Sequence, residues 1–264
     1  MPSMVIRTAA GMLPIKCQCM SHIRHLPEAP TGHRPLTAGA GMDAHRHDTH
    51  QIVYACRGVL SVTTDAGTWV APANRAIWVP AGTVHEHRAH GDTDLRLVGL
   101  THNPLNLGRP AVLAVGPLLR ELIIAYTADS AAPEAERARL LAVLLDQLKR
   151  APEQPFHLPT PRDPRLAAVC AALHDDPADP ATLARLAARA GTSERTLARL
   201  FRAELGMSFP QWRTQLRLHH ALVLLADGLP VTAVAHRCGW STPSAFIDVF
   251  KKAFGYTPGR AFTM

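Results

Sequence analysis

A pattern that occurs twice decides the fold of the C-terminal part of the chain. Residues 183–206 have the sequence LARLAARAGTSERTLARLFRAELG, and residues 231–255 have the sequence VTAVAHRCGWSTPSAFIDVFKKAFG. Each stretch predicts a helix of about eight residues, a turn at Gly191 or Gly239, and a second helix that starts at a hydroxyl side chain and ends before a glycine. This arrangement is typical of a helix-turn-helix motif, whose second helix enters the major groove of DNA.

The helical pattern continues on both sides of the two motifs. Asp163-Pro164 and Asp179-Pro180 open helices with proline at the first position, and Ser208 caps a long helix that runs to Gly228 between the motifs. We therefore predict an all-α domain with two helix-turn-helix motifs over residues 162–264.

The positive charge of the chain lies in the same region. The formal net charge of the 264 residues is +7, and residues 183–260 hold 11 Lys and Arg against 4 Asp and Glu, whereas the remainder holds 17 of each sign. A basic unit joined to a neutral one indicates a polyanion-binding module attached to a domain with another role. A solubilising surface is the alternative for the charge taken alone.

The second helix of the first motif carries the arginines that we expect at the DNA. Arg195 and Arg199 lie four residues apart in the half that reaches base edges, where an arginine can donate two hydrogen bonds to guanine. Arg202 is expected at a phosphate, and a solvated arginine is the alternative for each. The predicted DNA-binding residues of this motif are Ser193, Glu194, Arg195, Thr196, Arg199 and Arg202.

The second helix of the second motif has fewer donors. Its predicted DNA-binding residues are Ser241, Thr242, Ser244, Ile247, Asp248, Lys251 and Lys252. The two lysines are expected at phosphates, whereas Asp248 accepts a hydrogen bond from cytosine, pairs with a neighbour or weakens the contact. We expect weaker base discrimination here than in the first motif.

Further residues match a known family between about Pro164 and Phe262. They are Leu197 to Ser208, Arg217, Leu224-Leu225, Ala235, Cys238-Gly239-Trp240, Ala245-Phe246, Phe250-Lys251 and Gly255-Tyr256-Thr257-Pro258. At these positions the sequence resembles the DNA-binding domain of the AraC/XylS transcription factors. The resemblance implies that both recognition helices of one chain enter neighbouring major grooves on one face of DNA, and that an arginine usually stands at Asp248.

The N-terminal part has the pattern of a small β-domain. Short β-rich runs alternate with turn signals such as Arg57-Gly58 and Pro80-Ala81-Gly82. The runs are Gln51–Tyr54, Val59–Thr63, Thr68–Ala71, Ala76–Val79 and Leu95–Leu100. We predict a barrel or sandwich over residues 35–105, preceded by a disordered tail over residues 1–34.

Histidines are concentrated in this domain. Six of the fifteen are His45, His47, His50, His85, His87 and His90. The segments 45–51 (HRHDTHQ) and 80–85 (PAGTVH) resemble the two motifs of the cupin fold, over about Pro35 to Leu100.

The cupin resemblance implies a metal or ligand site made of His45, His47, Gln51 and His85. Gln51 stands where metal-bearing cupins carry a glutamate, and an amide brings no charge to balance a divalent cation. A divalent metal and a polar pocket for an organic ligand therefore both stay open. The other three histidines of the group, His50, His87 and His90, are expected at the surface.

A helical segment and a proline-rich linker join the two domains. Residues 110–150 predict two helices, Pro117–Tyr126 and Glu134–Arg150. The second has a stripe of leucines that either packs within the chain or forms a dimer; its members are Leu140, Leu141, Leu144, Leu145 and Leu148. Residues 151–161 carry four prolines, which predict an extended linker that holds the domains apart without fixing their orientation.

These observations predict an α+β multidomain regulator with a cupin-like sensor barrel and no catalytic residues. It would bind double-stranded DNA sequence-specifically, respond to a small-molecule effector or a metal, form a homodimer and act with RNA polymerase. A metal-dependent cupin enzyme, a dioxygenase or isomerase with a secondary helical domain, is the alternative. Gln51 and the confinement of the basic charge to the helical repeat disfavour it, and a structural nucleoid protein would not need a sensor barrel.

The number of cysteines and the hydropathy of the chain indicate its cellular compartment. The chain has five cysteines, an odd number with no pair of Cys-x-x-Cys units, which fits a reducing cytoplasm. The sequence has no apolar run of roughly 18 residues, so we expect no membrane span.

Overall fold

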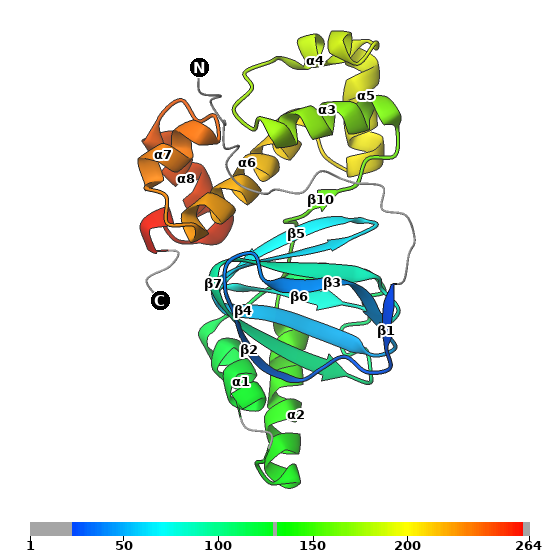
Figure 1. Ribbon diagram of the computed structural model, residues 1–264, viewed down its shortest axis with the longest axis vertical. Coiled ribbons are helices and arrows are strands. Elements are labelled where there is room, and N and C mark those ends of the chain that lie inside the picture. Colours follow the sequence, from blue (N-terminus) through cyan, green and yellow to red (C-terminus); the bar gives the residue numbers. More distant parts are fainter. Residues whose placement is uncertain (1–22, 129–130, 261–264) are drawn as a thin grey trace, which may run out of the picture.

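The protein consists of a sheet-rich N-terminal unit and a helical C-terminal unit (Figure 1). The computed structural model describes residues 23–128 and 131–260. A hairpin of two helices lies at one end of the sheet, and six helices lie at the other (Figure 1). The predicted fold class is therefore confirmed. Within the described ranges, no helix is both long enough and apolar enough to cross a membrane.

The sheet has ten strands, two of which come from the linker between the domains. The strands are β1 (Arg24–Leu26), β2 (Gly32–Leu36), β3 (Gly41–His47), β4 (His50–Thr64), β5 (Gly67–Pro72), β6 (Arg75–Val79), β7 (His85–Leu100), β8 (Ala111–Ala114), β9 (Glu153–Gln154) and β10 (Leu158–Pro159). The order is β1-β3-β7-β4-β6-β8-β9, with β2 on β7, β5 on β4 and β10 on β5. Most pairs are antiparallel, as expected for a barrel made of hairpins.

Alternate residues of the long strands β4 and β7 face two different apolar cores. One set, which includes Val53, Val62 and Leu97, packs inside the curled sheet. The intervening residues, such as Ile52 and Tyr54, point outward and are covered by helices. The period of two in a strand accounts for this separation.

The predicted turn at Arg57-Gly58 is wrong, because the two runs on either side of it form the single strand β4. The pairing of β4 with β7 shifts register around Arg57, which makes this site a bulge. Gly58 has φ +86°, and a Cβ there would lie 2.5 Å from the Thr93 hydroxyl oxygen. A glycine is needed for the bend in the strand, not for a chain reversal.

The predicted disordered tail, residues 1–34, is contradicted at its C-terminal end. Residues 24–26 form β1, which pairs with β3, and β2 begins at Gly32 and pairs with β7. These strands are short and polar, so their sequence alone does not predict them. Their pairing with β3 and β7 stabilises them. The remainder of the predicted tail, residues 1–22, lies outside the described residues.

The hairpin of α1 (Pro117–Ala128) and α2 (Glu134–Arg150) packs on the outer face of the sheet. Leu144 and Leu148, from the predicted leucine stripe, are fully buried, and Leu141 and Leu145 pack against the same core. The stripe is therefore used largely for packing within the chain. The free end of the hairpin projects away from the sheet (Figure 1).

The proline-rich segment 151–161 is extended, as predicted, but it does not hold the domains apart. β9 pairs with β8 and β10 pairs with β5, so both ends of the segment are fixed to the sheet. Phe156 and Leu158 are buried among residues of the helical unit. Prolines permit this because an edge strand needs few backbone donors.

The C-terminal unit contains the predicted helices, but the helix expected to open at Asp179-Pro180 begins only at Leu183, with Thr182 as its cap. The Asp179 carboxylate instead accepts from the Ala181 N–H at 2.7 Å in the turn before it. The helices are α3 (Pro164–Asp175), α4 (Leu183–Arg189), α5 (Glu194–Leu205), α6 (Phe209–Ala226), α7 (Val231–Arg237) and α8 (Pro243–Phe254), followed by a 3₁₀ turn at Pro258–Arg260. Three cysteines of the described residues, Cys56, Cys170 and Cys238, are buried and free, and the other two lie outside them.

Candidate DNA-binding surface and histidine cluster

The two predicted recognition helices, α5 and α8, have the same construction. The Ser193 hydroxyl accepts from the Thr196 N–H at 3.2 Å, and the Thr242 hydroxyl accepts from the Ala245 N–H at 3.2 Å. Each helix has twelve residues and ends at a glycine in the left-handed region. Local capping thus sets the start and the end of both helices.

The turn of each motif also depends on a glycine with positive φ. Gly239 has φ +77°, and a Cβ there would lie 2.6 Å from the Arg217 guanidinium and 2.7 Å from Ala178 Cα. Arg217 itself donates to the Pro177 carbonyl oxygen at 2.9 Å and lies over the Trp240 ring. Arg217 therefore packs the second motif against the loop between α3 and α4.

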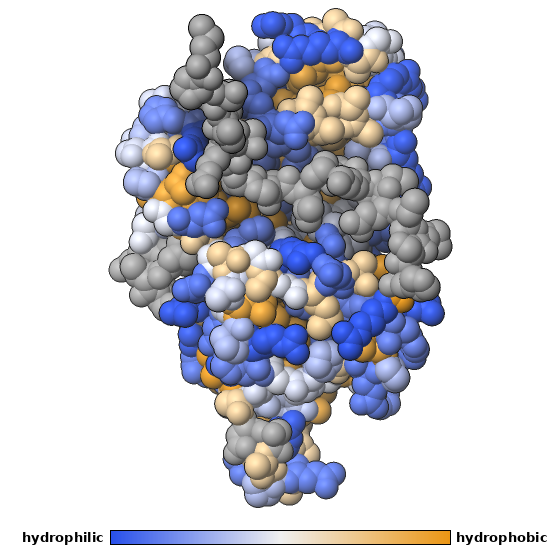
Figure 2. Space-filling model, in the orientation of Figure 1, coloured by the Kyte–Doolittle hydropathy of each residue, from blue (hydrophilic) through white to orange (hydrophobic). Residues whose placement is uncertain are grey.

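The outward face of α5 is basic and free of ion pairs. Arg195, Arg199 and Arg202 are exposed and line one shallow hollow on the surface. Among the described residues, no carboxylate lies within ion-pair distance of these three, in contrast to Arg189, which pairs with Asp179 at 2.8 Å. Figure 2 shows hydrophilic residues over this end of the helical unit.

The remaining predicted residues of the first motif lie around this face. Ser193 and Glu194 are exposed, and Thr196 is half-buried. The Ser193 and Thr196 hydroxyls are 2.9 Å apart, so both take part in the helix cap.

The outward face of α8 carries both signs of charge. Its exposed predicted residues are Ser241, Thr242, Ser244, Asp248, Lys251 and Lys252; Ile247 is half-buried. Asp248 makes no ion pair with any residue in the described ranges. The carboxylate therefore faces solvent.

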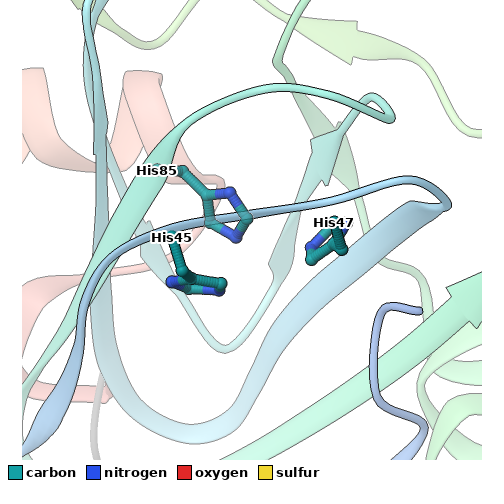
Figure 3. A group of neighbouring side chains, drawn as sticks. All are labelled: His45, His47 and His85. Carbon is teal, nitrogen blue, oxygen red and sulfur yellow. The ribbon is translucent and has the colours of Figure 1, made fainter. Parts of the chain in front are cut away.

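Three histidines converge at one end of the sheet (Figure 3). His45 and His47 come from β3 and His85 from β7, all are buried, and one ring nitrogen of each lies within 4.8 Å of the others. The His45 and His85 ring centroids are 4.2 Å apart, and those of His47 and His85 are 5.0 Å apart. The i, i+2 spacing on β3 and the antiparallel pairing of His45 with His85 bring them together.

Each of these rings is oriented by a carbonyl two residues away. The Nδ1 atoms of His45, His47 and His85 lie 2.8 Å, 2.6 Å and 3.0 Å from the carbonyl oxygens of Asp43, Thr49 and Thr83. A carbonyl can only accept, so Nδ1 carries the hydrogen and Nε2 keeps its lone pair. His85 Nε2 is buried without a partner among the described residues.

Gln51 adds an oxygen to the cluster. Its side chain is buried, its amide nitrogen donates to the Pro30 carbonyl oxygen at 3.3 Å, and Oε1 lies 3.3 Å from His47 Nε2. His47 Nε2 and Gln51 Oε1 thus lie at hydrogen-bond distance from each other, and both atoms are of a kind that can also bind a cation. Among the described residues, no carboxylate joins the group.

Burial favours the neutral form of the His45 and His85 imidazoles. It lowers the pKa of His85 to about 3 and also lowers the pKa of His45, in both cases chiefly by desolvation. A neutral imidazole with a free Nε2 is the form that binds a metal.

The expectation that His87 lies at the surface is wrong. Its side chain is 3% exposed, and its Nδ1 is buried with no described partner. His87 follows His85 by two residues in β7 and therefore faces the same way, a signal that the alternation of the strand contained. His50 and His90 are half-buried and hydrogen-bond to the Ala81 N–H and the Ser61 hydroxyl.

Both units of the chain match known protein families. The AraC-like ligand binding domain matches residues 31–109, and a helix-turn-helix domain family matches residues 186–264. The transcriptional regulator NimR of Escherichia coli is 34% identical over 219 residues, which are 82% of this chain and 80% of that protein. The chain belongs to the AraC family of transcriptional regulators.

Other similar proteins match a smaller part of the chain. The transcriptional regulator RipA of Corynebacterium glutamicum is 38% identical over 114 residues, 43% of this chain and 33% of that protein. The crystal structure of the DNA-binding domain of AdpA with a target DNA is 33% identical, covering 38% of this chain and 90% of that chain, with a TM-score of 0.36. The two matching domain families and the similarity to NimR show that the chain is a regulator with an AraC-like ligand-binding domain and a DNA-binding domain.

Proposed function

We propose that this AraC-family regulator selects its operator mainly through α5. The supporting observation is the set of three exposed arginines on that helix, none of which has a described ion-pair partner. Arg195 and Arg199 would donate to guanine, and Arg202 to a phosphate. The lysines of α8, Lys251 and Lys252, would add attraction to the backbone of a neighbouring groove.

Selection from randomised duplexes by the full-length chain tests this proposal. We expect a consensus of two parts about one helical turn apart, with the stronger base preference in the part that α5 contacts. Binding should weaken steeply as salt rises. A consensus whose stronger part is lost in a Lys251→Ala variant, and kept in an Arg199→Ala variant, would contradict it.

We further propose that His45, His47, Gln51 and His85 hold the effector, and that a divalent metal of the kind that imidazole binds is part of it. The fit is supported by three imidazoles whose Nδ1 atoms are fixed by carbonyls and by the unpartnered Nε2 of His85. A bound metal would supply a positive charge that the neutral donors do not cancel, so a further anionic ligand would be favoured there.

Metal analysis of protein purified without an affinity tag tests the site. We expect about one equivalent of a divalent ion in the parent chain and none in His47→Ala. His90→Ala is the matched control, because His90 lies in the same domain but bonds to Ser61. An equal metal content in the parent and in His47→Ala would overturn the metal proposal and leave the polar pocket for an organic small molecule.

A metal-dependent enzyme is the second candidate, because the same histidine cluster could serve one. The two functions differ in a simple observation. For a regulator, loading the site changes the affinity for the selected duplex; for an enzyme with an incidental helical domain, it does not. The neutral Gln51 in place of an acid supports the regulator, so we propose that the chain has no catalytic activity.

We propose a cytoplasmic homodimer that acts with RNA polymerase at promoters. The support for a dimer lies in the hairpin, where Leu118 of α1 is 56% exposed and Val143 of α2 is 46% exposed. Leu118→Glu with Val143→Glu should yield a monomer in sedimentation, with Leu144 and the packed stripe untouched. A double variant that stays dimeric would place the dimer contact elsewhere.

A further inference from the structure

The sensor barrel contacts one of the two recognition helices at its end. Asn74 and Arg75 occupy the turn between β5 and β6 and the start of β6. The Asn74 side-chain amide donates to the Phe254 carbonyl oxygen at 2.8 Å, and the Arg75 guanidinium donates to the Ala253 carbonyl oxygen. These are among the last carbonyls of α8, which have no partner within the helix and carry its negative dipole end.

Arg75 is held at this place by more than one group. Its guanidinium lies 5.0 Å from the Phe254 ring centroid and 5.8 Å from that of Phe156, and the residue is 4% exposed. Within the described ranges, no carboxylate lies at ion-pair distance from it. A buried guanidinium without a counter-ion is costly once its acceptors leave, so the contact requires the end of α8 to stay in place.

The first recognition helix has no equivalent anchor. The apolar core around α5 contains Leu158 of the linker strand β10 but, among the described residues, no member from β1 to β8. The core around α8 contains Val59 of β4 and Val70 of β5 as well as Phe156. The barrel therefore packs mainly against α6, the helix that joins the two motifs. It contacts the second motif directly at the end of α8 and reaches the first motif through the linker.

The same strand that carries Arg75 leads to the histidine cluster. Val79, at the other end of β6, pairs with Gln51. The turn that follows is tied to the histidine segment, because the Gly82 N–H donates to the His47 carbonyl oxygen at 2.8 Å. One five-residue strand thus spans the distance between the proposed effector site and the end of α8.

We propose that Asn74 and Arg75 are positioning residues for α8, and that β6 transmits a change at the histidine cluster to that helix. The first statement stands on the contacts at α8 alone. The second rests on the proposed effector site.

Arg75→Met in the full-length chain tests the first statement. Methionine keeps the apolar length of the side chain and removes its donors, so we expect about a tenfold loss of base preference in the duplex part that α8 contacts, and little change in the part that α5 contacts. Hydrogen exchange should rise at the amides near the end of α8 and stay constant in α5. Arg75→Lys, which keeps the charge and a donor, should recover part of both effects.

Arg96→Met is the matched control, because Arg96 is also a buried arginine of the sheet but pairs with Asp94 and contacts α1 through Thr127. It should leave the exchange of α8 unchanged. A loss that falls equally on both parts of the duplex, or an Arg75→Met chain with the exchange pattern of the parent, would overturn the positioning role.

Zinc titration tests the transmission separately. Zinc should slow exchange at the end of α8 in the parent and have no effect there in Arg75→Met, although both chains bind the same amount of zinc. If the parent binds zinc but α8 does not respond, transmission through β6 is wrong. If the parent binds no zinc, the proposal of a metal in the effector site and the transmission of a metal signal both fail, whereas the DNA result for Arg75→Met still decides the positioning role.

Discussion

The two helix-turn-helix motifs of this chain share a frame and differ in their surroundings. Both recognition helices have a hydroxyl cap, twelve residues, a buried phenylalanine and a left-handed glycine. The exposed face of α5 is basic, whereas that of α8 combines Asp248 with two lysines. α5 packs within the helical unit, whereas the C-terminal end of α8 is bonded to Asn74 and Arg75 of the sensor barrel.

This difference indicates a division of work between the motifs: the first discriminates bases, and the second responds to the sensor. A helix with several free arginines can discriminate bases through bidentate contacts. A helix whose end is bonded to the sensor is suited to change its position when the sensor changes. We therefore expect substitutions in the first motif to alter which operator is bound, and substitutions around the second to alter when it is bound.

The largest expected effect comes from the buried phenylalanines, Phe201 of α5 and Phe250 of α8. Replacement of either by alanine should lower the free energy of unfolding by about 3–5 kcal/mol, measured in urea. Because Phe250 shares a core with Val59 and Val70 of the barrel, only Phe250→Ala should also raise hydrogen exchange in β4 and β5 around these two valines. Equal exchange of these strands in the two variants would contradict the difference in anchoring, and the Phe→Leu variants serve as milder controls.

A second effect concerns acid and the helix α6, which joins the motifs. Burial lowers the pKa of His220 to about 4 from its usual 6.5. The folded state then binds fewer protons than the unfolded state between these values, so the stabilisation is complete above about pH 6.5 and is lost as the pH falls toward 4. His220→Gln should reduce the loss of unfolding free energy between pH 7.5 and pH 5, of which this residue supplies at most about 3 kcal/mol.

The acid test has a control in the same chain. His236→Gln replaces an exposed histidine of α7 and should leave the pH dependence as it is in the parent. If His220→Gln follows the parent at both pH values, the ring is not buried neutral in solution. The measurement is urea unfolding at each pH.

The prediction of the helical unit from sequence succeeded because its signals are local. Ser193, Thr242 and the glycines after each helix determine the helix ends within a few residues of themselves, and the apolar period of each helix identifies its buried face. The convergence of His45, His47 and His85 followed from a resemblance and from the alternation of residues in a strand. These inferences did not require knowledge of distant contacts.

Apart from His87, whose burial the alternation of β7 already indicated, and the start of α4, which a local turn at Asp179 delays, the errors in the prediction concern partners that are far away in the sequence. Gly58 ends no strand, because β7 opposite it continues the ladder. The linker packs against both units because Phe156 contacts Arg75 and Phe254, and neither residue is near Phe156 in the sequence. Arg75 was missed altogether, although a lone arginine that opens the apolar run RAIWV was a visible signal. Long-range pairing decides such positions, and local pattern does not.

A third effect sharpens the role of α5. Arg199→Ala should lower discrimination at one base pair by about 1–3 kcal/mol, measured by competition between the selected duplex and single-base variants. Arg202→Ala is the matched control on the same helix: it should weaken all duplexes alike and reduce the slope of affinity against salt by about 1. An unchanged base preference in Arg199→Ala would remove this arginine from the set of base contacts.

The smallest expected effect separates the possible roles of Asp248 on α8. Asp248→Asn removes the charge and nearly keeps the shape, so relief of repulsion from phosphates should raise the affinity for every duplex by about 1 kcal/mol or less. If the carboxylate instead accepts a hydrogen bond from cytosine, the same variant should weaken binding only to duplexes with that cytosine. Asp248→Arg should also steepen the salt dependence by about one counterion, because it adds a phosphate contact. A specific loss in Asp248→Asn would mean that α8 discriminates bases as α5 does, and the division of work between the motifs would then lie in their anchoring alone.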